Sequence, residues 1–149
     1  MVIVSGGQTG VDRAALDVAL ALGLPCGGWC PKGRKAEDGL IDPRYPLQET
    51  LSADYAQRTE WNVRDSDGTL LLNQGALEGG TAQTREIAER LDRPVLIVDL
   101  DRPPAPAAVR SWIEQSRIRI LNIAGPRESK RPGVYAQAAA FLRTLLIPD

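Results

Sequence analysis

The stretch from Val2 to Leu22 constrains the fold of this chain more than any other part of the sequence. Residues 2–4 form a β-branched run typical of a buried strand, and glycines follow at positions 6, 7 and 10. From Val11 to Leu22, apolar residues recur at helical spacing, and Gly23 ends the pattern. A strand, a glycine-rich turn and a helix in immediate succession indicate an α/β protein.

The start of this predicted helix also suggests a binding site. The first N–H groups of a helix lack partners and carry a partial positive charge, so they suit a phosphate or another anion. The turn is not a Walker motif, because no Lys-Ser/Thr pair follows Gly10, and its glycines lack the GxGxxG spacing of dinucleotide-binding proteins. The same glycines are also consistent with a tight turn that binds nothing, so the prediction needs support from other residues.

The length and the charge of the chain limit its class. With 149 residues, of which 43% are hydrophobic, we expect a single domain spanning residues 1–149. The 18 basic and 19 acidic residues are scattered, which argues against a surface for long nucleic acids. No stretch is apolar enough to span a membrane, and residue 1 leads directly into the first strand without a signal-like segment. We therefore expect a cytoplasmic protein.

Histidine is absent, which limits the chemistry that the chain could perform. Its absence excludes the Ser-His-Asp triad and most zinc sites, so any catalysis would use carboxylates, hydroxyls, Lys or Arg. Cys26 and Cys30 are the two cysteines, and their spacing fits neither a zinc pair nor a CxxC redox motif. We expect two free thiols in a reducing compartment and no metal site.

Strand and helix patterns alternate along the chain. The sequence predicts a doubly wound, parallel, three-layer α/β/α sheet with strand order 2-1-3-4-5 and right-handed crossovers. Ligands bind such sheets where the winding reverses, here between the first and third strands at their carboxyl ends. Strands are predicted at 2–4, 26–29, 69–73, 95–100 and 119–124, and helices at 11–22, 53–67, 81–93, 107–115 and 134–146.

Two predicted segments carry unusual polar residues. The helix at 53–67 has one polar face, formed by residues such as Tyr55, Arg58 and Asn62 at helical spacing. The long loop at 31–46 is rich in glycine, proline and charge, and its charged residues could close over an anionic ligand or remain solvated.

A second glycine-rich loop, from Gly75 to Thr81, flanks the same crevice and precedes a helix. Arg127 and Lys130 follow the last strand and should lie at the same edge of the sheet. Two glycine-rich loops and two basic residues at one edge predict a phosphate site. The predicted binding residues are Gly6, Gly7, Gln8, Thr9, Gly10, Asp12, Arg13, Gly79, Gly80, Thr81, Arg127 and Lys130.

Three blocks of the sequence carry a resemblance to a known family. SGGQTGVDRAALD at 5–17, RTEWNVRDSDGTLLL at 58–72 and LNIAGPRESKRPGVY at 121–135 are similar to the putative molybdenum carrier family. That family belongs to a Rossmann-like group that also includes the LONELY GUY phosphoribohydrolases and lysine-decarboxylase-like proteins. The resemblance implies that the bound ligand or cofactor is molybdenum cofactor (molybdopterin) or another nucleotide-like phosphate.

The hydrolases of this group carry a PGGxGTxxE signature, which this chain matches in part. Gly79, Gly80 and Glu86 fit the two glycines and the glutamate, whereas three positions depart from it: Glu78, Ala82 and Gln83. If the protein is a hydrolase, the resemblance implies that Glu86 is catalytic and that Arg58 assists it.

Other acidic residues are candidates for catalysis, and each also has a structural explanation. The role of Asp12 could be limited to stabilising a helix N-terminus. Asp65 and Asp67 could cap a helix and begin a turn, and Glu86 could lie on a solvated helix face rather than act in catalysis.

Two functions therefore stay open. The favoured one is a binding protein for a phosphorylated, nucleotide-like ligand, that is, a molybdenum cofactor carrier. The alternative is a nucleotide hydrolase that resembles nucleoside-monophosphate phosphoribohydrolases. In either case we expect a homo-oligomer whose partner is a small phosphorylated ligand rather than a long nucleic acid or a membrane.

Overall fold

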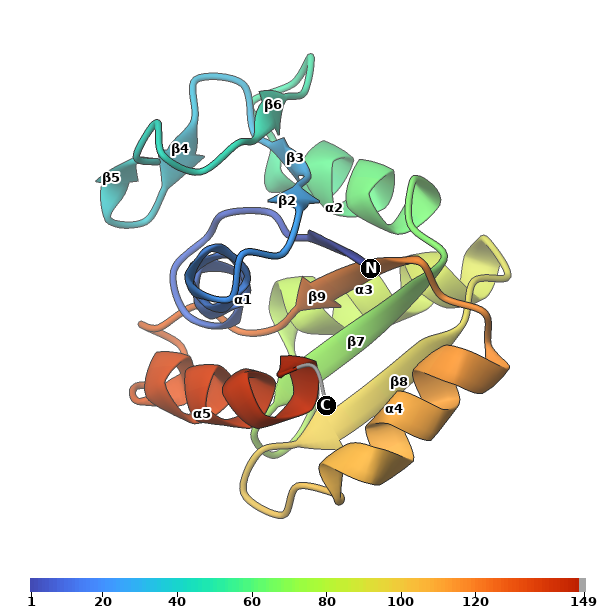
Figure 1. The fold of residues 1–149 in the computed structure, drawn as a ribbon. Coiled ribbons are helices and arrows are strands. Elements are labelled where there is room, and N and C mark those ends of the chain that lie inside the picture. Colours follow the sequence, from blue (N-terminus) through green and yellow to red (C-terminus); the bar gives the residue numbers. More distant parts are fainter. Residues whose placement is uncertain (148–149) are drawn as a thin grey trace.

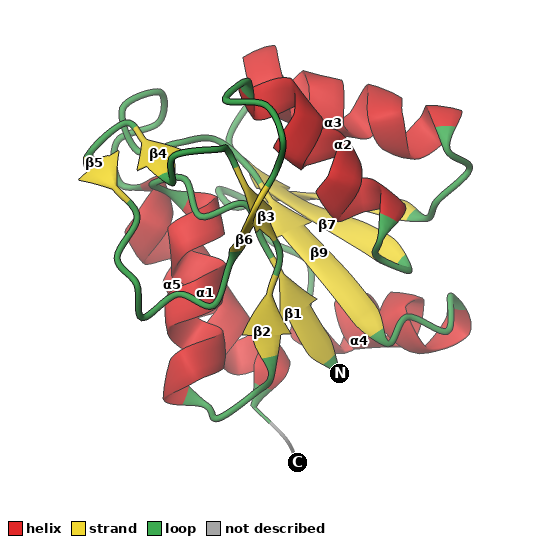
Figure 2. Ribbon diagram, turned by 90° about the horizontal axis from the view of Figure 1, so that it is seen from above, coloured by secondary structure: helices red, strands yellow, loops and turns green. Residues whose placement is uncertain are grey.

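The computed structural model describes residues 1–147, and its centre is a five-stranded parallel sheet with the order β2-β1-β9-β7-β8 (Figure 1). Helices cover both faces, so the predicted doubly wound α/β fold is confirmed (Figure 2). The strands of this sheet are β1 (Val2–Val4), β2 (Cys26–Gly27), β7 (Gly68–Asn73), β8 (Val95–Asp99) and β9 (Ile120–Ala124). The helices are α1 (Val11–Ala21), α2 (Tyr55–Arg64), α3 (Gly79–Arg90), α4 (Pro106–Gln115) and α5 (Val134–Leu146).

The predicted strand order 2-1-3-4-5 is wrong in one respect, the position of the last strand. β9 does not lie at the edge but between β1 and β7, where Leu121 pairs with Ile3 and Ile123 pairs with Leu70. Leu121 and Ile123 are completely buried, whereas Ile97 of the edge strand β8 is 40% exposed. The strand in the central position is the more buried one, because both of its faces are covered there.

The core has a separate part on each face of the sheet. On one face, α1, α4 and α5 pack together over the strands, and the buried side chains of α1 and α5 are mostly alanine, valine and leucine. On the other face, α2 and α3 pack against each other around Val63, Ile87 and Ala88. None of the described helices combines the length and hydropathy needed to cross a membrane.

The strand predicted at 26–29 is divided by Gly28. β2 ends at Gly27, and β3 (Trp29–Cys30) pairs instead with β6 (Gln48–Glu49) in a small second sheet. Gly28 has φ +131°, and a Cβ there would lie 2.3 Å from the Ser5 carbonyl oxygen. A side chain at this position would therefore clash with the end of β1.

The predicted loop at 31–46 is not open but contains a hairpin of β4 (Lys35–Ala36) and β5 (Gly39–Leu40). Arg34, which was a candidate to contact an anion, instead donates hydrogen bonds to four backbone carbonyl oxygens of this segment. Those carbonyls belong to Ile41, Asp42, Tyr45 and Leu47. The guanidinium therefore holds the segment together.

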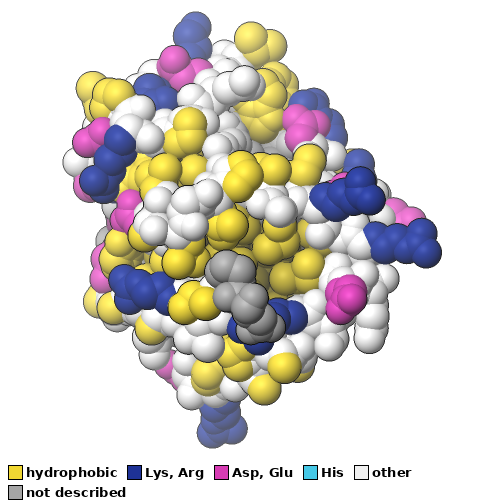
Figure 3. Space-filling model, viewed as in Figure 1, with side chains coloured by type: hydrophobic (Ala, Val, Ile, Leu, Met, Phe, Trp, Pro, Cys, Tyr) yellow, Lys and Arg dark blue, Asp and Glu magenta, His cyan; other side chains and the backbone are white. Residues whose placement is uncertain are grey.

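The charged side chains are spread over the surface. On the face seen in Figure 3, the Lys and Arg side chains of the described residues are separated from one another by apolar, acidic and uncharged groups.

Candidate functional site

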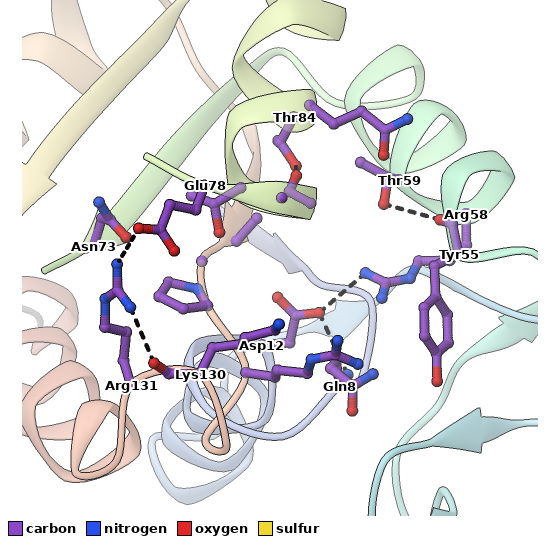
Figure 4. Close-up of a pocket in the computed structure, with 18 residues that line it drawn as sticks. Gln8, Asp12, Tyr55, Arg58, Thr59, Asn73, Glu78, Thr84, Lys130 and Arg131 are labelled. Carbon is purple, nitrogen blue, oxygen red and sulfur yellow. Dashed lines mark hydrogen bonds and ion pairs between the residues drawn. The ribbon is translucent and has the colours of Figure 1, made fainter. Parts of the chain in front are cut away.

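A cavity of about 320 Å³ opens at the carboxyl ends of β1, β9 and β7 (Figure 4). This volume lies within the usual range for small-molecule sites. Four parts of the chain form it: the β1–α1 loop with the start of α1, α2, the β7–α3 loop with the first turns of α3, and the β9–α5 loop. The lining residues are Gln8, Asp12, Tyr55, Arg58, Thr59, Asn73, Glu78, Gly79, Gly80, Thr81, Gln83, Thr84, Ala124, Gly125, Pro126, Arg127, Lys130 and Arg131.

Two helices begin at this cavity. Gly79, Gly80 and Thr81 are the first residues of α3, and Asp12 lies in the first turn of α1. Neither helix has a side-chain cap among the described residues. The Val11 N–H donates to the Pro126 carbonyl oxygen and the Thr81 N–H to the Glu78 carbonyl oxygen, whereas the Gly79 and Gly80 N–H groups have no partner among the described residues. These two N–H groups and the positive ends of both helix dipoles are therefore available to an anion.

The glycines of α3 keep this helix start open. A Cβ added to Gly79 or Gly80 would meet no atom within 4 Å, so it would project into free space. Because both residues line the cavity, a side chain at Gly80 would take up space that a ligand could use.

Basic side chains outnumber acidic ones around the cavity. Four of the lining residues are basic and two, Asp12 and Glu78, are acidic. Arg131 is partly neutralised, because its Nη2 atom lies 3.2 Å from Glu78 Oε1. Lys130 is exposed, and Arg127 Nε lies 3.7 Å from Glu37 Oε1. The remaining basic residue, Arg58, belongs to α2.

Asp12 and Arg58 form an ion pair at the inner wall of the cavity. Asp12 Oδ2 lies 3.2 Å from Arg58 Nη1 and accepts a second hydrogen bond, of 3.3 Å, from the Gln8 N–H. The two side chains are 4% and 13% exposed. Burial raises the pKa of Asp12 from 3.8 to about 6, although Arg58, the Gln8 N–H and Arg13 partly oppose it. The carboxyl therefore titrates near neutral pH.

Gly6 makes room for this pair. A Cβ at Gly6 would lie 2.4 Å from Arg58 Nη1 and 2.9 Å from Asp12 Oδ2. The first glycine of the predicted loop is therefore needed for the close approach of two side chains, not for contact with a ligand.

The structure brings together eight of the residues that the sequence singled out. They are Gln8, Asp12, Arg58, Gly79, Gly80, Thr81, Arg127 and Lys130, and all of them line the cavity.

The other binding residues predicted in the first glycine-rich loop do not line the cavity but determine the backbone path of that loop. Gly7 and Gly10 both have φ +78°, and a Cβ at Gly10 would lie 2.3 Å from the Pro126 carbonyl oxygen. Arg13 donates to the Gly7 carbonyl oxygen and forms an ion pair of 3.0 Å with Asp38. The Thr9 hydroxyl accepts a hydrogen bond from the Glu128 N–H. These residues fix the path of the loop.

Glu86 lies outside the cavity. It is exposed and lines a separate depression between α2 and α3, together with Glu60 and Arg90. Successive residues of a helix are 100° apart, so Glu86 is directed away from the side that carries Gly80 and Thr84. The structure therefore does not bring Glu86 together with Arg58 in one cavity.

Asp65 and Asp67 have structural contacts. Asp65 accepts a 2.9 Å hydrogen bond from Trp29 Nε1 and pairs with Arg64. Asp67 accepts hydrogen bonds from the backbone N–H groups of Arg119 and Ile120, which joins the segment between α2 and β7 to the start of β9.

Several lining residues were not predicted as site residues, although the sequence held signals for some of them. Tyr55 and Thr59 belong to the polar face of the helix at 53–67, and buried Asn73 ends an apolar strand. Arg131 directly follows Lys130. The other additions are Glu78 from the loop before α3, Gln83 and Thr84 from α3, Ala124 from the end of β9, and Gly125 and Pro126 from the loop after β9.

The described residues contain no group of three or more His, Cys, Asp or Glu side chains that could hold a metal ion. Cys26 and Cys30 are free thiols outside the cavity, and burial raises the pKa of both.

A parallel sheet with a cavity at the carboxyl ends of its central strands, where two helices begin, defines a Rossmann-like ligand-binding fold. The chain belongs to the circularly permutated YpsA SLOG family, whose model matches residues 3–146. It is also similar to a putative molybdenum carrier protein from Syntrophus aciditrophicus SB, known from a crystal structure at 1.45 Å resolution. The two share 48% sequence identity over 98% of this chain and 94% of that chain, with a TM-score of 0.94. The predicted family resemblance is thus confirmed. No curated protein matches the sequence.

Proposed function

We propose that the protein binds a small phosphorylated, nucleotide-like ligand in this cavity. The observation that carries the proposal is the meeting of two uncapped helix N-termini and four basic side chains around one space of about 320 Å³. Phosphate groups suit such sites, because helix N–H groups and cations both stabilise their charge. The name of the similar protein supports the molybdenum cofactor as the particular ligand and a carrier as the role.

The phosphate would lie at the start of α3. There Gly79 and Gly80 offer N–H groups without a partner among the described residues, and Arg127 and Lys130 line the same cavity from the loop after β9. A phosphorylated pterin and a nucleotide share this phosphate group, so the basic residues and the helix start would hold either one. The metal of a molybdenum cofactor would be carried by its organic part, since the described residues offer no cluster of metal ligands.

Transport of an intact ligand fits the cavity better than hydrolysis by the predicted residues. The hydrolase alternative depends on Glu86, and Glu86 lies in a different depression. The cytoplasmic location and the homo-oligomer stay predictions from the sequence, and light scattering on the purified protein measures the oligomeric state.

The test is to identify the ligand and to measure its affinity with and without its phosphate. Native mass spectrometry of the gently purified protein should show a bound mass that denaturation releases. Calorimetry should then show binding of nucleoside 5′-monophosphates or a phosphorylated pterin, and much weaker binding of the dephosphorylated compounds. Equal affinity for phosphorylated and dephosphorylated compounds, or no binding of either, contradicts the proposal.

A further inference from the structure

The Asp12–Arg58 pair leaves hydrogen-bonding groups unused on both residues. Asp12 makes its hydrogen bonds through Oδ2, and its other oxygen is directed into the cavity (Figure 4). Arg58 bonds to the described residues through Nη1 alone, and its buried Nε has no partner among them. A guanidinium has five N–H donors, so an ion pair with one contact is incomplete. Both side chains line the cavity, where a ligand could complete their hydrogen bonds.

The unused groups are of opposite kinds, and this limits what can bind between them. The free oxygen of Asp12 accepts a hydrogen bond, and the remaining N–H groups of Arg58 donate. A phosphate dianion offers acceptors only, and the Asp12 carboxylate would repel it. A hydroxyl group both donates and accepts, so it complements the pair.

The position of the pair within the cavity agrees with a sugar. In Figure 4, Asp12 lies between the start of α3 with Glu78 on one side and Tyr55 with Arg58 on the other. Tyr55 is 38% exposed, and the Cζ atom of the Arg58 guanidinium lies 5.2 Å from the centre of the Tyr55 ring. A nucleotide has its phosphate, ribose and base in this same order, and aromatic rings are suitable partners for a base.

We propose that Asp12 and Arg58 bind the 2′-hydroxyl of a ribose, which makes the ligand of this cavity a ribonucleotide. This inference rests on the proposed function, because it assumes that a phosphate occupies the start of α3. Asp12 and Arg58 then determine specificity: they favour ribonucleotides over 2′-deoxyribonucleotides and over inorganic phosphate.

Calorimetry on the wild-type protein at pH 7.5 tests this with matched probes. These are the four ribonucleoside 5′-monophosphates, their 2′-deoxy counterparts and inorganic phosphate. We expect at least one ribonucleotide to bind about 10- to 100-fold more tightly than its 2′-deoxy form, which is the worth of one hydrogen bond to a charged group. Equal affinity for the two forms overturns the inference, and this comparison needs no variant.

The variant Asp12→Asn tests which residue is responsible. We expect it to bring the affinity for the ribonucleotide to within about threefold of that for the 2′-deoxy form. Glu86→Gln is the matched control, because it makes the same acid-to-amide change outside the cavity, and it should keep the wild-type preference. A preference that survives in folded Asp12→Asn overturns the role of Asp12.

The remaining outcomes separate this inference from the proposed function. If inorganic phosphate binds but no ribonucleotide does, the ribose site is wrong and the phosphate site stands. If a phosphorylated pterin binds and ribonucleotides do not, the inference fails in the same way. If none of these compounds binds, both proposals fail.

Discussion

The Ser129 N–H donates a 3.2 Å hydrogen bond to the carboxylate of Glu37, although the two residues are 92 positions apart. Glu37 lies in the turn between β4 and β5, and it also accepts a hydrogen bond from the Thr9 hydroxyl. One carboxylate thus joins the hairpin, the first glycine-rich loop and the loop before α5. Arg127, a lining residue of the cavity, lies against the same carboxylate.

Replacing Glu37 should loosen these three segments together. In Glu37→Ala we expect the free energy of unfolding to fall by about 1 to 2 kcal/mol, because hydrogen bonds to a charged acceptor are lost. Hydrogen exchange should become faster in the hairpin and at 127–130. Lys35→Ala is the control, since this exposed residue lies in the same hairpin. Unchanged exchange in Glu37→Ala would contradict this role.

The stability of the protein should depend on the titration of Asp12. Its pKa is raised from 3.8 to about 6 in the folded state by burial, so the folded state binds a proton more tightly than the unfolded state. The resulting stabilisation is complete below about pH 4 and is lost as the pH rises to about 6; it amounts to about 3 kcal/mol.

The variant Asp12→Asn has an amide at position 12 that does not titrate, so comparison with the wild type isolates the contribution of Asp12 to the pH dependence of stability. Urea unfolding between pH 4 and 7.5 should show the wild type losing stability relative to Asp12→Asn as the pH rises. Asp12 pairs with Arg58 as an ion only above its own pKa, so this interaction is already part of the pH dependence, and the variant resembles the protonated wild type at each pH. A difference between the two proteins that stays constant across this range would contradict the raised pKa.

Gly80→Val should prevent ligand binding without unfolding the protein. A Cβ at Gly80 meets no atom within 4 Å, so the fold accommodates the side chain, which then occupies space at the start of α3. We expect a native circular dichroism spectrum and no measurable affinity for a phosphorylated ligand. Ala82→Val lies two residues further along the same helix and outside the lining, so it should bind normally. Normal binding by Gly80→Val would exclude this helix start as the phosphate site.

Arg127 and Lys130 should contribute to ligand affinity only through the phosphate group. The double variant Arg127→Ala, Lys130→Ala should weaken a phosphorylated ligand by about 10- to 100-fold and its dephosphorylated analogue much less, because charge-assisted bonds to phosphate are lost. Arg85→Ala, Arg90→Ala removes the same charge from the outer side of α3 and should have little effect. If both ligands lose affinity equally, these residues support the loop rather than bind phosphate.

Glu86→Gln addresses the hydrolase alternative. Because Glu86 lies outside the cavity, we expect this variant to bind ligand as the wild type does. Chromatography of a nucleotide panel incubated with the wild type should detect no free base if the protein is a carrier. Release of base that disappears in Glu86→Gln would restore the hydrolase assignment.

The sequence was sufficient for most helices and strands because burial repeats at a fixed spacing. The apolar run at 69–73 lies within β7, and the helical stripe from Val134 to Leu146 is α5. The break at Gly28 was not predictable, because strands of two residues are too short to show a period.

The features of the structure that the sequence did not predict depend on contacts between distant segments of the chain. The position of β9 is decided by which strands bury it, not by its own residues alone. Asp12 and Arg58 are 46 positions apart, and the sequence showed an acid at a helix start and an arginine on a polar helix face without their contact. Glu86 fits a motif, but the side of α3 that faces the cavity depends on how this helix packs against α2 and β7.

The central place of β9 has a consequence for biosynthesis. During translation, β1, β2, β7 and β8 leave the ribosome before β9. They form two strand pairs, β2-β1 and β7-β8, which are not hydrogen-bonded to each other until β9 lies between them. Pro126 and Arg127, which complete the cavity wall, follow β9 directly. The nascent chain therefore completes this cavity in one late step, after the translation of nearly the whole described chain, and the cavity does not exist while the first four of these strands are being made.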